Sequence, residues 1–124
     1  MIPRYRAWLK EDKEMVDVEE IYFYKGEFDF IGDAITWMCK SNDCVLMQST
    51  GLRDKDGKEI FEGDIVKMAK NVYSELTYYE VVRHRGGAYR LESKRYGCEL
   101  WLRHTDCEIA GNIWENPELL EVKQ

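Results

Sequence analysis

The sequence predicts a mainly β protein in which a β-rich N-terminal half precedes a small SH3-like β-barrel. Short runs of β-branched, aromatic and alternating residues are separated by turn residues roughly every eight to twelve positions, as in small sandwiches and barrels. From Glu59 onward, these runs are about as numerous as the strands of an SH3-like barrel. A helix-start pattern near the C-terminus adds one short helical turn.

Length and composition fit one small folded unit. The chain has 124 residues, and 44% of them are hydrophobic, which is enough for a buried core. We expect a single unit over residues 1–124, with the β-rich subdomain at about 1–50 and the barrel at about 51–124. The sequence has no apolar run of ~20 residues and no apolar centre of a signal peptide, so we expect a cytoplasmic protein without a membrane segment.

The first third of the chain predicts three strands. Arg4–Lys10 alternates imperfectly between two faces, and a charged loop follows it. Met15–Tyr24 alternates as far as Val18 and ends in an aromatic block. After a turn at 25–27, Phe28–Ile31 is a short alternating strand, and the short connections favour antiparallel pairing.

The segment 32–40 allows two interpretations. Asp33 could cap a single helical turn that brings Ile35, Met38 and Cys39 inward. A strand fits the same residues equally well. We favour extended or irregular structure, followed by a turn at 41–43.

The densest turn signals follow this segment. Val45–Gln48 is a short apolar strand that we expect to end at Ser49-Thr50-Gly51. Asp54-Lys55-Asp56-Gly57 carries the Asp-Gly pair that is typical of a tight turn.

Two apolar residues and a second turn come next. Ile60 and Phe61 are expected to be buried. Gly63-Asp64 then turns the chain into the β-rich run Ile65–Met68. Two glycine-containing turns so close together indicate a compact corner rather than a helix.

The second half continues as strands and turns. A loop at 69–76 leads to Thr77–His84, a β-branched and aromatic run that is the clearest strand of this half. The turn Arg85-Gly86-Gly87 connects it to a returning strand, Ala88–Ser93. After a break at Tyr96-Gly97, the sequence predicts a short apolar segment and a further strand, at 98–103 and 107–113.

Asn116-Pro117-Glu118 is a helix-start pattern. The side chain of an N-cap asparagine accepts a hydrogen bond from an otherwise unpaired backbone N–H of the first turn, and proline fits the first helical position. We expect one or two turns, with Leu119 and Leu120 holding them against the barrel.

The turn residues belong to a longer pattern. It consists of Leu46-Met47-Gln48, Thr50-Gly51-Leu52, Asp54-Lys55, Gly57-Lys58-Glu59-Ile60 and Glu62-Gly63-Asp64-Ile65-Val66, with Arg6-Ala7-Trp8 before it and Gly111-Asn112-Ile113 and Glu115-Asn116-Pro117-Glu118-Leu119-Leu120 after it. This pattern resembles the signature of the YopX-like family of bacteriophage and prophage proteins, over essentially the whole chain. Its structural motif comprises Thr50, Gly51, Asp54, Gly57, Gly63, Asp64, Gly111, Asn112, Asn116 and Pro117.

The resemblance implies a fold and a biological setting, but no reaction. It implies a small β-barrel half, preceded by another β-rich half that helps the protein to oligomerise. It also implies an accessory protein of a phage or prophage that works in the cytoplasm of the bacterial host. The family has no assigned catalytic residues, so none is carried over to this chain.

A basic and aromatic cluster in the second half is the main candidate binding site. Arginine beside aromatic rings suits single-stranded nucleic acid, because the charge meets the backbone and the rings stack on bases. The net charge of −6 favours a plainer interpretation, in which these cations are solvated and paired with acids of the N-terminal half. A subunit interface is the third interpretation. The candidate residues are Arg83, Arg85, Tyr89, Arg90, Lys94, Arg95 and Arg103.

Metal binding and catalysis find little support. Four cysteines, at positions 39, 44, 98 and 107, fit free thiols better than a zinc site. Turn chemistry explains Asp54 and Asp56 without a calcium loop. The sequence has no phosphate loop and no hydrolase motif, so we expect no cofactor, no metal and no enzymatic activity.

The leading hypothesis is a non-enzymatic protein-interaction module that self-associates and binds a host or phage protein. The alternative is a nucleic-acid-binding regulatory protein that uses the Arg83–Arg103 region. An exposed apolar surface around Trp8, Tyr22 and Trp37 would favour the first hypothesis. A continuous basic surface beside Tyr89 would favour the second.

Overall fold

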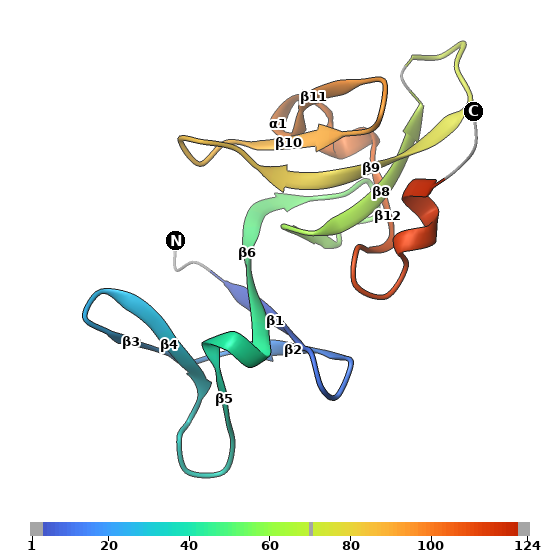
Figure 1. The fold of residues 1–124 in the computed structure, drawn as a ribbon. Coiled ribbons are helices and arrows are strands. Elements are labelled where there is room, and N and C mark those ends of the chain that lie inside the picture. Colours follow the sequence, from blue (N-terminus) through green and yellow to red (C-terminus); the bar gives the residue numbers. More distant parts are fainter. Residues whose placement is uncertain (1–3, 70, 122–124) are drawn as a thin grey trace. The chain divides into compact units, whose positions relative to one another are not determined.

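The computed structural model describes residues 4–69 and 71–121, and this part of the chain is mainly β. It contains twelve strands in three antiparallel sheets, and its helices are single short turns (Figure 1). The predicted mainly β class is confirmed. No helix in the described residues is long and apolar enough to cross a membrane.

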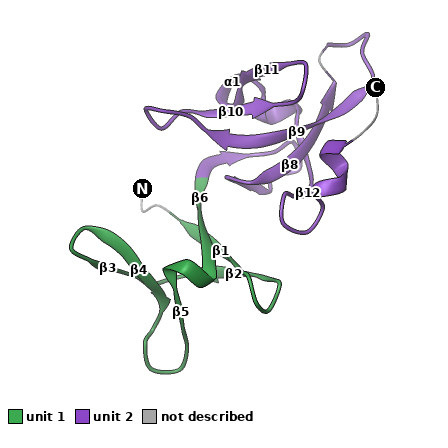
Figure 2. Cartoon of the chain, in the orientation of Figure 1, with its two compact units in different colours: residues 1–49 green, residues 50–124 purple. Residues whose placement is uncertain are grey.

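The chain divides into two compact units (Figure 2). Unit 1 comprises residues 1–49 and unit 2 comprises residues 50–124. The strand β6 (Cys44–Arg53) runs through the boundary between them. Each unit has its own cluster of buried apolar side chains.

Unit 1 holds two small antiparallel sheets. Its strands are β1 (Tyr5–Leu9), β2 (Glu14–Val18), β3 (Ile21–Tyr24), β4 (Glu27–Gly32) and β5 (Met38–Lys40), and a 3-10 turn, η1 (Ser41–Asp43), precedes β6. In one sheet β1 lies between β2 and the first half of β6, which places Ala7 opposite Val16 and Leu46. In the other sheet β4 lies between β3 and β5. The buried apolar cluster of unit 1 consists of Ala7, Ile31 and Cys44.

The predicted strand Met15–Tyr24 is wrong, because it is two strands in different sheets. β2 ends at Val18 and β3 begins at Ile21, and the two acidic residues between them are exposed. The carbonyl of Glu20 accepts the N–H of Gly32 at 3.1 Å, which starts the pairing of β3 with β4. Two consecutive acidic side chains do not fit a half-buried alternating strand, so the chain breaks there.

The predicted strand end at Ser49-Thr50-Gly51 is also wrong, because β6 continues to Arg53. The Thr50 hydroxyl donates to the carbonyl of Ile60 at 2.7 Å and accepts the N–H of Leu52 at 3.1 Å. These bonds keep the Thr-Gly pair within the strand, next to β7 (Glu59–Phe61).

A five-stranded antiparallel sheet forms most of unit 2 and curls on itself (Figure 1). Its strands are β8 (Asp64–Ala69), β9 (Leu76–Arg83), β10 (Tyr89–Glu92), β11 (Gly97–Glu99) and β12 (Glu108–Asn112). Their order is β11-β10-β9-β8-β12, so the last strand returns to pair with β8. The predicted β9–β10 turn is confirmed, because the N–H of His84 donates to the carbonyl of Ala88 at 2.8 Å.

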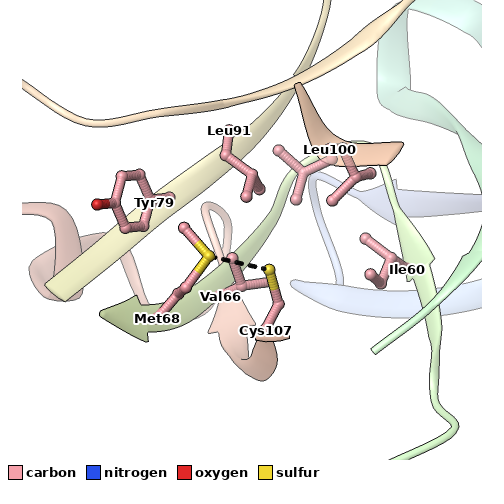
Figure 3. Packing of buried hydrophobic residues seen from close by; sticks show 8 residues of the cluster. Ile60, Val66, Met68, Tyr79, Leu91, Leu100 and Cys107 are labelled. Carbon is pink, nitrogen blue, oxygen red and sulfur yellow. Dashed lines mark hydrogen bonds between the residues drawn. The ribbon is translucent and has the colours of Figure 1, made fainter. Parts of the chain in front are cut away.

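The core of unit 2 gathers alternate side chains of β8 and β9. A strand turns every second side chain to the same face, so Val66 and Met68 lie on one face with Tyr79 and Val81. Figure 3 shows these strands and their neighbours directing apolar side chains toward one another. The buried cluster consists of Ile60, Val66, Met68, Tyr79, Val81, Leu91, Leu100 and Cys107.

The apolar segment predicted at 98–103 is a strand end followed by one helical turn, α1 (Leu100–Arg103). Leu100 is fully buried, whereas Trp101 and Leu102 are 65% and 58% exposed. The helical turn therefore directs one leucine into the core and leaves its two neighbours in solvent. A 3-10 turn, η2 (His104–Asp106), then leads into β12.

The predicted C-terminal helical turn is present as a 3-10 turn, η3 (Pro117–Glu121), which packs against β9. Leu119 and Leu120 are half-buried there. The role expected of Asn116 is different from the one observed. Its side-chain Oδ1 accepts the N–H of Asn112 at 3.2 Å, so it braces the loop before the turn.

Candidate interaction surfaces

Asp54, from the sequence signature, is a structural residue of unit 2. It is 5% exposed, and its carboxylate accepts the N–H groups of Asp56 and Lys58, at 2.9 Å each, and of Ile109 at 3.0 Å. Burial alone would raise the pKa of Asp54, but these donors hold it below its ordinary value. Asp54 therefore joins the turn 54–57 to β12.

Signature residues near the C-terminus close the end of β12. Asn112 Oδ1 accepts the N–H groups of Trp114 and Glu115, at 3.0 and 2.9 Å. Gly111 lies so close to Asn116 that a Cβ at position 111 would be 2.3 Å from Asn116 Oδ1. These signature residues therefore stabilise the fold of unit 2. The side chains of Asp54 and Asn112 form hydrogen bonds with backbone N–H groups.

Two arginines of the predicted basic cluster are paired with acids. Arg90 Nε lies 3.1 Å from Glu92 Oε2, and Arg90 Nη1 also binds the carboxylate of Glu99. Arg103 Nε lies 3.0 Å from Asp106 Oδ2. These acids come from the same half of the chain, not from the N-terminal half as the sequence suggested.

The other members of the basic cluster lie at two ends of β10. The register places Arg83 opposite Tyr89 at the β9–β10 hairpin, and Arg85 lies in its turn. Lys94 and Arg95 lie in the turn from β10 to β11. All four cations are exposed. The structure therefore does not bring the seven candidate residues together into one group.

The four cysteines fall into two pairs, one in each unit. Burial is the main cause that raises the pKa of Cys44 and of Cys107 to about 12. A thiol with so high a pKa is a poor nucleophile at neutral pH. Cys39 and Cys98 are half-buried. Within residues 4–69 and 71–121, no three His, Cys, Asp or Glu side chains are placed to share a metal ion.

We expect a strong chelator to leave the melting temperature unchanged within about 1 °C, because a protein with four free thiols would gain no folding free energy from a metal. Thermal unfolding followed by circular dichroism, with and without the chelator, measures this. A structural zinc protein treated in the same way is the control. A lower melting temperature in the chelator would overturn the assignment of four free thiols.

In unit 1, three consecutive aromatic residues of β3 remain in solvent. Tyr22, Phe23 and Tyr24 are 37%, 65% and 65% exposed, and we call them the aromatic edge. β3 is the outer strand of its sheet and pairs with β4 (Figure 1). The ring of Tyr22 stacks on Phe30 with 4.5 Å between centroids, which supports the hairpin. Trp8, which the sequence grouped with Tyr22, is buried and is not part of this surface.

A loop between β4 and β5, held by hydrogen bonds to Asp33, exposes two more apolar side chains, Ile35 and Trp37. Asp33 accepts the N–H groups of Ile35 and Thr36, at 2.8 and 2.7 Å, and that of Trp37 at 3.2 Å. The hydroxyl of Thr36 and these N–H groups lower the pKa of Asp33. Ile35 is 89% exposed, so the inward orientation considered for it and for Met38 is wrong.

A groove of about 640 Å³ lies in unit 2 between β9, the β10–β11 turn and η3, and we call it the η3 groove. Burial, and then the charge of Glu92, raises the pKa of Glu80 in its wall. Of the residues that line the groove, the sequence predicted only the cations Lys94 and Arg95 as binding candidates. The signal for Glu80 in the sequence is a single glutamate within the β-branched and aromatic run 77–82. The residues that define the groove chemically are Tyr78, Glu80, Glu92, Lys94, Arg95 and Leu119.

The chain is similar to a protein family and to two crystal structures. Residues 4–121 match the family model described as YopX protein. Protein EF1440 from Enterococcus faecalis is 30% identical, with a TM-score of 0.71, and the match covers 97% of this chain and 99% of that one. Protein yopX from Bacillus subtilis is 22% identical, with a TM-score of 0.69 and coverages of 94% and 97%. No curated protein matches the chain.

Proposed function

The chain belongs to the YopX protein family, and on this premise we propose that it is a non-enzymatic protein-interaction module of a phage or prophage. In this proposal it works in the cytoplasm of a bacterial host, self-associates through unit 1 and binds a host or phage protein. The observation that carries the proposal is the aromatic edge.

An aromatic strand at the edge of a sheet favours association with another chain. Phe23 and Tyr24 keep about two thirds of their surface in water. Burying apolar surface contributes roughly 25 cal/mol per Å², and aromatic residues are enriched in protein interfaces. An edge strand also offers backbone N–H and C=O groups to a partner strand. Both contributions would act at the same place.

The loop between β4 and β5 supports the same role. Asp33 holds the loop by three backbone hydrogen bonds, so Ile35 and Trp37 are displayed on a fixed backbone. A surface that is ordered before binding loses less conformational entropy when a partner docks. Binding through these exposed apolar residues would therefore cost less conformational entropy than binding through a flexible tail.

The fold of unit 2 suits a binding module as well. We include in the proposal that unit 2 is an SH3-like barrel. Its last strand, β12, follows the short turns α1 and η2 and returns to pair with β8. This pairing covers the free edge of β8 and leaves β11 and β12 as the outer strands of the curled sheet.

Phe23→Arg should raise the dissociation constant of the self-associated protein at least about 30-fold. The substitution would place a charge in the apolar interface where the ring of Phe23 is buried on assembly. Sedimentation equilibrium measures the change. Tyr73→Arg is the matched control, since Tyr73 is a 95% exposed aromatic residue of unit 2. A folded Phe23→Arg protein that assembles like the wild type would refute the assignment of the aromatic edge.

The alternative function is nucleic-acid binding through the Arg83–Arg103 region. It retains four exposed cations, Arg83, Arg85, Lys94 and Arg95. They lie at two ends of β10, and Arg90 between them is neutralised by acids. A nucleic-acid strand would meet separate charges rather than a basic track, so the interaction module is the better supported function.

A further inference from the structure

The η3 groove contains a half-buried carboxylate without a partner. No hydrogen bond or ion pair joins the side chain of Glu80 to another residue within 4–69 and 71–121. Glu92 lies opposite Glu80 in the register of β9 and β10, but Arg90 and His84 approach it at 3.1 and 3.3 Å. The charge of Glu80 is therefore the one that a cation from outside would stabilise most.

The surroundings of Glu80 favour a long side chain over a free metal ion. Tyr78 projects from the same face of β9 as Glu80, and Leu119 and Leu120 of η3 line the same groove. Lysine and arginine combine an apolar stem with a charged head, so they can pack on such walls while the head reaches a carboxylate. A bare cation needs several converging oxygen ligands, and no three His, Cys, Asp or Glu side chains of the described residues are placed to share one.

The remaining groups of the groove set its polarity. Lys94 and Arg95 are exposed on the β10–β11 turn at its rim, and Glu75 lines it together with Glu80 and Glu92. Three carboxylates would repel the phosphates of a nucleic acid along most of the groove. A segment with a basic residue toward β9 and an acidic residue toward the β10–β11 turn would match both signs of charge.

We propose that the η3 groove binds an extended segment of a partner protein that places a Lys or Arg side chain against Glu80. Apolar neighbours of that residue pack on Tyr78, Leu119 and Leu120. The inference rests on the proposed role as an interaction module, but it does not rest on self-association, because the groove and the aromatic edge belong to different units.

The test is a selection of random displayed peptides on the full-length protein, followed by fluorescence anisotropy with the enriched peptide. We expect enrichment of Lys or Arg flanked by apolar residues. Glu80→Gln should weaken binding of the enriched peptide at least tenfold, which corresponds to about 1.4 kcal/mol. The control Glu118→Gln removes an exposed acid of η3 that does not line the groove and should bind like the wild type.

Further measurements separate this proposal from a folding defect and from the proposed self-association. Glu80→Gln should melt at or above the wild-type temperature at neutral pH, because it removes an uncompensated half-buried charge. Phe23→Arg should bind the peptide as tightly as the wild type. The proposal is wrong if no peptide is enriched, if the enriched peptides lack a cation, if Glu80→Gln leaves their affinity unchanged, or if single-stranded DNA displaces them from the groove.

Discussion

Asp54→Ala lowers the free energy of unfolding by about 3–4 kcal/mol, because it leaves three backbone N–H groups of unit 2 without their acceptor. The carboxylate of Asp54 binds the N–H groups of Asp56, Lys58 and Ile109, and it is 5% exposed. Water cannot readily replace an acceptor at so buried a position. Chemical denaturation of the wild type and the variant measures the loss.

Two further substitutions, one at Asp54 and one at Asp56, separate the loss of these hydrogen bonds from other effects on stability. Asp54→Asn keeps one acceptor oxygen but loses the charge, so it should cost about half as much. Asp56→Ala changes an exposed residue of the same turn and should stay within about 0.5 kcal/mol of the wild type. Equal losses for Asp54→Ala and Asp56→Ala would show that the carboxylate of Asp54 does not hold the turn.

The contribution of Asp54 also has a defined pH dependence. Its pKa is lower in the folded protein than the ordinary value of 3.8. The carboxylate therefore contributes its full stability above pH 3.8, and this contribution is lost as the pH falls through the lowered folded pKa. The stability difference between the wild type and Asp54→Ala should shrink in that acidic range.

Gly63→Val should cost at least about 3 kcal/mol of unfolding free energy, because a β-branched residue is strained at positive φ and Gly63 is also buried. Gly63 has φ 88°, its N–H donates to the carbonyl of Val81 and its carbonyl accepts the N–H of Ile113, each at 2.9 Å. Both bonds prevent the backbone from moving to relieve the strain. Thermal or chemical denaturation measures the cost.

Gly86→Val is the matched control for this substitution. Gly86 has φ 89°, but a Cβ there meets no atom within 4 Å. Gly86→Val should therefore pay only the backbone strain, about 1–2 kcal/mol. A Gly63→Val protein with the wild-type melting temperature would contradict the turn that the sequence predicted at Gly63-Asp64.

The sequence predicted the turns of unit 2 well because their cause is local. Gly57, Gly86 and Gly87 all adopt positive φ where a turn was expected. Side chains such as Asp54 bond the backbone within a few residues, so the pattern of residue types carries the geometry. The η3 turn was predicted for the same reason.

The elements that were predicted wrongly depend on distant pairing. The carbonyl of Ile60 accepts the Thr50 hydroxyl and keeps β6 extended through Gly51. Leu100 enters the core because the helical turn α1 packs against β10. Neither effect is present in the sequence around the residue itself.

Prediction of the candidate surfaces failed where it depended on exposure. Trp8 and Tyr22 look alike in an alternating strand, yet Trp8 is buried and Tyr22 belongs to the aromatic edge. Arg90 looked available for nucleic acid, but Glu92 lies two residues away on the same strand, and the pairing of β10 with β11 brings Glu99 opposite it. The pairing of Arg90 with Glu99 depends on the register of two strands, which the residues around Arg90 do not determine.

Sedimentation equilibrium of the wild-type protein over a wide range of concentrations tests the central claim most directly. The interaction-module account predicts a mass that rises above the 14.7 kDa of one chain as the concentration increases. A mass of 14.7 kDa at every concentration would contradict self-association through the aromatic edge.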